Sequence, residues 1–494
     1  MRVIHNPQFS LGQIPIEDLQ FDPCSRDDIP AILQGIQFIY CDSDLRHAIF
    51  DCLEQHILKP SQAPQEGPDS KPDSPAVVDP SNGRPGMDLW DILVLGLLKQ
   101  GLNCDCDRLA ELANRHLDVR RMLGLSEAAD SPPLHWRTVN RNLQLLTPEL
   151  LAEINQLVVQ AGHALAGHAP QQPLAARCDS FVVETDVHYP TDVSLLWDAL
   201  RCLLRSVAAA SGLWGVRGWR QKRAWLWKLK TLFNRVRSSK QRGKRPERVE
   251  LYVRQAERLA GRARVSPEAL ESAGCGEATR SEIEGYVELV ERLAEQVRRR
   301  VLKGETIPQE EKLFSIFAPH TRWCAKGKAG RAVELGVPVT IVESEYQFLL
   351  HGKVMWSEAD VDVAAQVIEE TQAEYPELEQ CSFDKGYHSP ANQQRLGELL
   401  KENVLPRKGK LSKAAQEREG EAVFQAARKA HPAVESAINN LERRGLDRVR
   451  EQGSEGFERM VWLGMLAANL HRIGCLVRNG KRERLRRKGV GKAA

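Results

Sequence analysis

The order of strand-like and helical segments in the second half of the chain constrains the fold more than any other feature. From Arg177 the apolar residues form a short β-rich run that includes Phe181, Val182 and Val183. Further strand-like segments follow at 337–342, 347–354, 380–383 and 403–406. Helical segments run over 360–373, over 390–400 and from about Ala433 onward. A chain with this alternation is predicted to be of the α/β class.

A long helical stretch, from Leu195 to about Leu313, separates the first strand-like run from the second. Without it, the order is three strands, then helix, strand, helix, strand and helix. This order is typical of an RNase H-like α/β core, which we expect to comprise 174–194 and 320–478. The segment 195–319 is then predicted to be a large, basic helical insertion in that core. No internal repeat is evident.

The chain has 494 residues, more than one hydrophobic core usually serves, so further domains are expected before this core. Residues 1–58 are predicted to form a small helical unit. Residues 59–86 contain seven prolines among Ser, Asp and Gly, a composition typical of a linker. Residues 87–165 show three helical segments with tight connections. This pattern fits a helix-turn-helix-like DNA-binding region and fits a plain helical bundle equally well.

The composition limits the class of protein. An apolar fraction of 42% and a charged fraction of 27% are ordinary for a soluble globular protein. The eleven cysteines are scattered, with Cys104 and Cys106 as the one close pair, which favours reduced thiols over a structural zinc. No signal peptide is evident, and no run approaches ~20 apolar residues. We therefore expect a cytoplasmic protein without a membrane span.

Three carboxylates stand where an α/β core would place a metal site. Asp179 lies early on the first predicted strand, Asp384 just past the end of a later one, and Glu435 at the start of a helix after His431-Pro432. Ligands of open α/β sheets gather at such strand ends. Each carboxylate alone is more often a cap or a solvated side chain, so only the combination is informative. Asp186 and Asp192 compete with Asp179 for the first position.

Converging carboxylates suit phosphodiester chemistry. Such chemistry activates a water or a 3′-hydroxyl beside a stabilised leaving oxygen, and two Mg²⁺ ions roughly 3.5–4 Å apart serve both needs. Mg²⁺ prefers oxygen ligands, and Mn²⁺ accepts the same set. We expect two such ions, held by the three carboxylates.

Three segments resemble ISNCY-type insertion-sequence transposases, which belong to the DDE superfamily with an RNase H-like catalytic domain. They are 178–192 (CDSFVVETDVHYPTD), 383–392 (FDKGYHSPAN) and 434–448 (VESAINNLERRGLDR). The segments GFER at 456–459 and LAANLH at 466–471 fit the closing helix of such domains. The resemblance covers about 87–478, and the DKGY block is its most specific part.

The resemblance implies a DDE triad of Asp179, Asp384 and Glu435, with Tyr387 and His388 lining the site. It also implies Mg²⁺-dependent cleavage and transfer of DNA strands by a protein that binds terminal inverted repeats as at least a dimer. Such a mobile-element enzyme is expected in the bacterial cytoplasm, on the nucleoid. One position departs from the family: many relatives carry Lys seven residues after the glutamate, where this chain has Glu442. The replacement cation is predicted to be Arg443, Arg444 or Arg448.

The DNA contacts are predicted at clusters of basic residues. Between Arg217 and Arg248 the chain holds thirteen Lys and Arg and one acid, Glu247, which is typical of a phosphate-binding surface. Trp214, just before this stretch, and Trp219, Trp225 and Trp227 within it have a spacing that favours packing over base stacking. The basic tail, 479–494, is expected to be a disordered arm. The predicted DNA-binding residues are Arg137, Arg141, Arg220, Lys222, Arg223, Lys228, Lys230, Lys326, Lys328, Lys385, Arg407 and Lys408.

Two other functions remain open from the sequence. One is a transposase-derived DNA-binding protein that has lost catalysis, an interpretation that Glu442 leaves open and the three carboxylates disfavour. The other is a metal-dependent nuclease that cuts DNA without joining it, since both reactions use the same metal site.

Overall fold

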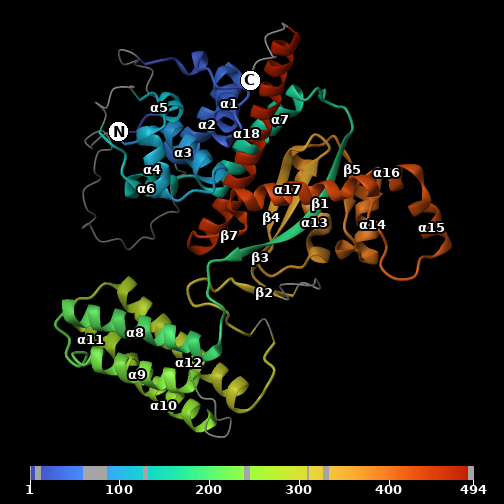
Figure 1. Ribbon diagram of the computed structural model, residues 1–494. Coiled ribbons are helices and arrows are strands. Elements are labelled where there is room, and N and C mark those ends of the chain that lie inside the picture. The colour runs from blue at the N-terminus through green and yellow to red at the C-terminus, as the bar shows by residue number, and fades with distance from the viewer. Residues whose placement is uncertain are drawn as a thin grey trace, which may run out of the picture. The chain divides into compact units, whose positions relative to one another are not determined.

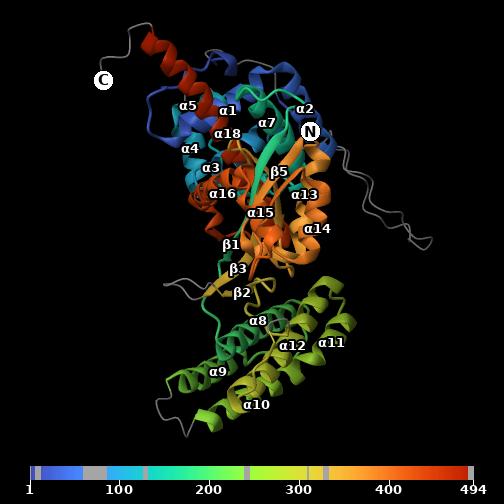
Figure 2. The same ribbon diagram turned by 90° about the vertical axis from the view of Figure 1, so that its right-hand side faces the viewer.

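The computed structural model describes residues 2–5, 13–58, 86–125, 132–238, 245–308, 311–325 and 333–487. The chain forms two compact units, which Figures 1 and 2 show from two directions. Unit 1 combines Met1–Glu184 with Val337–Ala494, and unit 2 is Thr185–Gly336. Unit 2 is thus an insertion in chain order, wider than the predicted 195–319. The predicted linker lies outside the described residues, except for Gly86.

Unit 1 is built on a mixed β-sheet, so the chain is of the mixed α/β class. The strand β1 (Leu174–Thr185) lies between β3 (Val333–Ser344) and β5 (Leu378–Phe383). β1, β5 and β6 (Glu402–Val404) run parallel, whereas β4 (Leu349–Val354) pairs antiparallel with β3. The two-residue β7 (Arg448–Val449) pairs with β1. The four predicted strand-like segments after residue 336 are confirmed as strands.

Helices cover both faces of this sheet (Figure 1). α13 (Asp360–Glu374) and α14 (Pro390–Leu399) share a core with Cys178, Cys381 and Phe383. On the other face, α17 (Val434–Leu441) and α18 (Gly453–Arg487) share a core with Phe181 and Val183. Between β6 and α17 the chain forms α15 (Lys413–Gly420) and α16 (Ala422–Ala430).

The two cores meet β1 at different points of its length. Leu174, Ala176 and Cys178 are buried in the core with α13, whereas Phe181 and Val183 are buried in the core with α17. Successive side chains of a strand point to opposite faces, so this change of the buried face falls at Asp179 and Ser180. The two polar residues occupy the only stretch of β1 where neither face is fully covered.

The helices before residue 166 belong to the same core as the sheet, rather than to separate domains. Three of them pack directly against α18, which comes from the other end of the chain. Local periodicity cannot reveal such a partner, which is why the sequence predicted two free-standing regions at 1–58 and 87–165. The helices are α1 (Asp28–Cys41), α2 (Ser43–Leu53), α3 (Leu89–Gly101), α4 (Cys106–Arg115), α5 (Leu117–Met122), α6 (Trp136–Leu143) and α7 (Pro148–Leu165).

α18 extends through Arg487, so residues 479–487 of the predicted disordered arm are helical, and 488–494 lie outside the described residues. Among the described residues, the segment Gly453–Arg484 is the one helix whose length and hydropathy would allow a membrane span. Within its most apolar window, 67% is buried inside the protein, and the helix packs on α1, α3 and α7. These are the contacts of a core helix.

Unit 2 is a helical bundle with its own core, as predicted for the insertion. The first and last long helices, α8 (Asp192–Leu213) and α12 (Glu277–Val297), pack along each other. α9 (Lys222–Arg237) and α10 (Arg245–Arg264) complete the core. β2 (Arg322–Ala325) pairs antiparallel with the first residues of β3. The short helix α11 (Ser266–Ser272) follows α10 in the chain. Single turns of helix complete the chain: η1 (Ile16–Asp18), η2 (Glu54–Leu58), η5 (Arg298–Leu302), η6 (Lys385–Tyr387), η7 (His431–Ala433) and η8 (Glu442–Leu446).

Candidate active site

Parallel pairing of β1 with β5 brings Asp179 beside Asp384. The register pairs Cys178 with Phe383, so each aspartate is the next residue after a paired position. Adjacent strands lie about 4.8 Å apart, and side chains alternate between faces. The two carboxylates therefore lie on the same face, at the end of β5.

Glu435 approaches the same place from α17. Its neighbours Val434 and Ala437 are buried against Phe181 and Val183, the residues that follow Asp179 on that face of β1. This packing fixes the first turn of α17, and the side chain of Glu435 remains exposed. The three predicted carboxylates thus come from one neighbourhood of unit 1.

A fourth carboxylate, Asp360, was not predicted as a site residue. It is the first residue of α13, and its Oδ1 accepts a hydrogen bond of 2.7 Å from the Ser180 hydroxyl. Its Oδ2 lies close enough to Gly386 that a Cβ there would stand 3.2 Å from it. The sequence did place a helix start at Asp360, but acidic residues are common in the first turn of any helix. The local pattern therefore gave no signal for a site.

The pKa of Asp179 reflects its burial and the acidic side chains near it. Burial is the main cause that raises its pKa, to about 6, and the charges of Asp384, Asp360 and Glu435 raise it further. The backbone N–H of Ser180 donates to Asp179 Oδ1 at 2.8 Å and opposes the rise. Near neutral pH, four acids thus share a small region, and their repulsion favours binding of a cation.

The donor set fits a hard divalent cation, because carboxylate oxygens are the ligands that Mg²⁺ prefers. Asp179, Asp384 and Glu435 would hold it, and Asp360 is the additional oxygen donor nearby. In the part of the chain that the structure describes, no group of three Asp, Glu, His or Cys side chains is close enough together to coordinate a metal ion. The exposed side chains of Asp384 and Glu435 would need to turn toward Asp179.

Basic side chains surround the acidic group. Arg428 on α16 donates to the Phe383 carbonyl at 3.0 Å and lies 3.8 Å from Asp384. Lys408, one of the predicted DNA-binding residues, donates to the Gly386 carbonyl at 2.9 Å and so contacts the DKGY segment. Partial burial lowers the pKa of His388, and the charges of Arg407 and Lys408 lower it further. A negatively charged substrate would meet these cations beside the carboxylates.

The two residues predicted to line the site have different positions. Tyr387 is fully buried, and its hydroxyl lies 3.1 Å from that of Thr340 on β3. Its ring packs against Phe383, so it anchors the DKGY segment in the core rather than facing a substrate. His388 is half-buried and remains at the surface of that segment.

The structure separates the three arginines proposed to replace the missing lysine at position 442. Arg444 is buried and donates to the Gly101 carbonyl at 2.6 Å, so it joins η8 to α3 rather than serving the site. Arg448 forms an ion pair of 3.1 Å with Glu184. Arg443 is exposed and lines a cavity with Ser436 and Asn440 on α17. A substrate could therefore reach Arg443 without the loss of either the buried hydrogen bond or the ion pair.

The competing first carboxylates have other positions. Asp192 begins α8, and it accepts hydrogen bonds from Gln296 at 2.8 Å and from Arg300 at 2.7 Å. Asp192 therefore holds together the helices of unit 2. Asp186 follows the end of β1 and also belongs to unit 2. The carboxylate that adjoins Asp384 is Asp179.

The predicted DNA-binding residues fall on two exposed helices and on the loops of the site. On α6, Arg137 and Arg141 are exposed beside Trp136. On α9 and just before it, Lys222 is half-buried and the others are exposed: Arg220, Arg223, Lys228 and Lys230. Lys385, Arg407 and Lys408 are exposed as well. Lys326 and Lys328 lie outside the described residues.

The tryptophans of unit 2 mostly pack, as predicted. Trp219 is buried and donates to Ser266 Oγ at 3.1 Å, and Trp225 packs against it edge to face. Lys230 lies over the stacked rings of Trp197 and Phe233. Trp214 and Trp227 are exceptions, at 39% and 72% exposed.

Comparison of the chain with protein-family models, with curated proteins and with solved structures gives no match.

Proposed function

We propose that this protein is a DNA transposase of the DDE class. The observation that carries the proposal is that Asp179, Asp384 and Glu435, from three distant segments, lie in one neighbourhood near the end of β5. The order of strands and helices along unit 1 supports an RNase H-like core. The resemblance of the three segments to ISNCY-type transposases gives the reaction class, and with it at least a dimer on DNA.

In this proposal the three carboxylates hold Mg²⁺ or Mn²⁺. The bound metal supplies an activated nucleophile and charge neutralisation at the phosphate. The other residues orient the DNA strand. Arg428 and Lys408 contact the segment that carries Asp384, so in this proposal they neutralise phosphates of the bound DNA strand.

The remaining DNA is bound by basic helices. α9 carries six Lys and Arg and no acid, so it favours phosphate contacts without reading sequence. The exposed Arg137 and Arg141 on α6 are the proposed contacts to base edges or phosphates of the terminal repeats.

The test uses purified protein and labelled DNA that carries the inverted repeats flanking its own gene. Wild-type protein with Mg²⁺ is expected to cleave at the repeat ends and to join them to a target plasmid. Asp384→Asn should lose both reactions, by about a thousandfold or more, because a metal ligand and its charge are removed. DNA binding in a gel-shift assay should survive, since the basic helices are unchanged.

Glu398→Gln on α14 is the matched control, because it removes an exposed carboxylate outside the site. Cleavage without joining would favour a nuclease. Binding of the repeats by wild-type protein, with no cleavage in Mg²⁺ or Mn²⁺, would favour a transposase-derived DNA-binding protein and contradict the proposal.

A further inference from the structure

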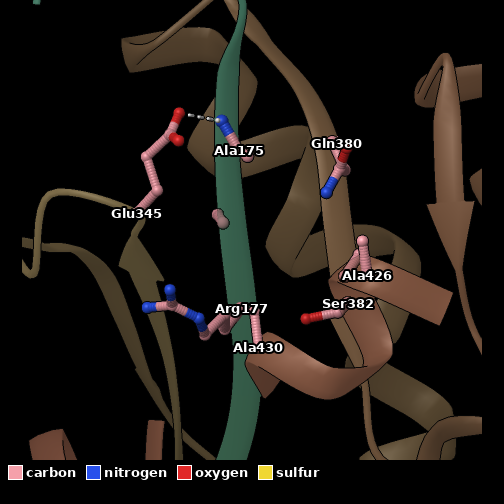
Figure 3. A pocket seen from close by; sticks show the side chains of 9 residues that line it. Ala175, Arg177, Glu345, Gln380, Ser382, Ala426 and Ala430 are labelled. Carbon is pink, nitrogen blue, oxygen red and sulfur yellow. Dashed lines mark hydrogen bonds between the residues drawn. The ribbon is translucent and has the colours of Figure 1, made fainter. Parts of the chain in front are cut away.

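A hollow of about 220 Å³ adjoins the carboxylates on the same face of the sheet. Figure 3 shows its walls: Arg177 and Glu345 lie to one side of β1, and Gln380 and Ser382 on β5 to the other. Ala426 and Ala430 of α16 form the remaining wall. All of these residues belong to unit 1.

The pairing of β1 with β5 shows that this hollow lies next to the carboxylates. β1 and β5 pair Ala175 with Gln380 and Arg177 with Ser382, and Asp179 and Asp384 follow two residues farther along each strand. Two residues of a strand span roughly 6.6 Å. A group in the hollow therefore lies about one nucleotide away from a phosphate at the carboxylates.

The walls of the hollow match the chemistry of a nucleobase. Small alanine side chains leave flat apolar surface, while the polar groups stand at the edges. Among the described residues, the Gln380 amide forms no side-chain hydrogen bond, so it can both donate to and accept from a base edge. Glu345 accepts one hydrogen bond, from the backbone N–H of Ala175, and retains further acceptor capacity.

The size is also suitable. An apolar cavity of about 150 Å³ is enough to hold benzene. The hollow is larger, so it has room for a heterocyclic ring together with its exocyclic groups. A base pair is larger than this volume, so a single base is the better fit.

We infer that this hollow receives an unpaired nucleobase of the DNA strand, from a nucleotide next to the bond that is cut. The inference rests on the proposed function and adds a substrate subsite to it. A base must leave its stack to enter, at a cost of a few kcal/mol that is least for mismatched or unpaired bases. The protein would thereby favour DNA whose ends are already distorted or open.

The experiment compares repeat-end DNA with the same DNA lacking one base, on each side of the cut in turn. Ala430→Leu narrows the hollow from an exposed position of α16 and should fold normally. It is expected to slow cleavage of intact DNA about tenfold, since a stacked and hydrogen-bonded base contributes on that order. On DNA lacking the base that enters the hollow, wild type and Ala430→Leu should cleave equally. Ala422→Leu, exposed on the same helix but outside the hollow, is the control.

Equal cleavage of intact DNA by wild type and Ala430→Leu would overturn the inference, as would an equal loss on both DNAs. A second readout works without catalysis: 2-aminopurine at the same nucleotide brightens when it becomes unstacked. If wild-type protein does not cleave, the proposed function fails. In that case the subsite is supported if the 2-aminopurine fluorescence increases on binding of wild type but not of Ala430→Leu. It is contradicted if the two proteins give the same fluorescence.

Discussion

Replacing Asp179 by Asn is expected to abolish the proposed cleavage and, at the same time, to stabilise the metal-free protein. The loss of activity should reach about a thousandfold, because roughly 4 kcal/mol of metal-dependent stabilisation is removed. The gain in stability has a separate cause. In the folded protein burial and three neighbouring acids raise the pKa of Asp179 from 3.8 to about 6, so its charge near pH 7 opposes folding.

The sign of this effect gives its pH window. With a folded pKa above the unfolded one, the protonated side chain favours folding below pH 3.8, and this contribution is lost as the pH rises through about 6. Asn carries no charge at any pH. Asp179→Asn should therefore gain about 2 kcal/mol at pH 7, after allowance for partial exposure, and little near pH 4.

The measurement is urea denaturation in EDTA at both pH values, followed by the same pair with Mg²⁺. Saturating Mg²⁺ should stabilise the wild type and leave Asp179→Asn almost unchanged, because ligand binding to the folded state shifts the equilibrium. Glu398→Gln on α14 should show neither effect. A variant that is less stable than wild type at pH 7 without metal would contradict the electrostatic account of Asp179.

Replacing Gly474 by Ala is expected to cause the largest loss of stability. Gly474 on α18 and Gly35 on α1 lie where the two helices cross with backbones in contact. A Cβ on Gly474 would fall on the carbonyl oxygen of Ala31, and one on Gly35 would fall on that of Leu470. Since backbone atoms cannot rotate away, the helices must separate, at a cost of about 3 kcal/mol or more. The melting temperature of unit 1 should fall by roughly 5–10 °C.

Gly480→Ala is the control within the same helix. Gly480 is exposed, and a Cβ there would meet no atom within 4 Å. The substitution should stabilise the protein by roughly 0.5–1 kcal/mol, because Ala is the better helix former. The melting temperatures of both variants are measured by calorimetry. If Gly474→Ala and Gly480→Ala have similar melting temperatures, α1 and α18 do not cross this closely.

Local pattern was sufficient for the elements and for the order of the sheet region. The strand-like runs at 337–342 and 380–383 and the helices that start at Asp360 and Pro390 are present where the periodicity predicts them. The spacing of the tryptophans likewise indicated packing, which Trp219 and Trp225 show. These features depend on neighbouring residues along the chain, so a single sequence carries them.

Three features depended on contacts between distant segments, and only the tertiary structure decided them. The pairing of Cys178 with Phe383 places Asp179 beside Asp384, and the hydrogen bond from Ser180 adds Asp360 to the acids. The burial of Arg444 against Gly101 removes it from the candidate cations. Periodicity records which face of a segment is apolar and not which partner covers it. For the same reason the N-terminal helices were predicted as separate domains, although they share one buried core with α18 and the sheet.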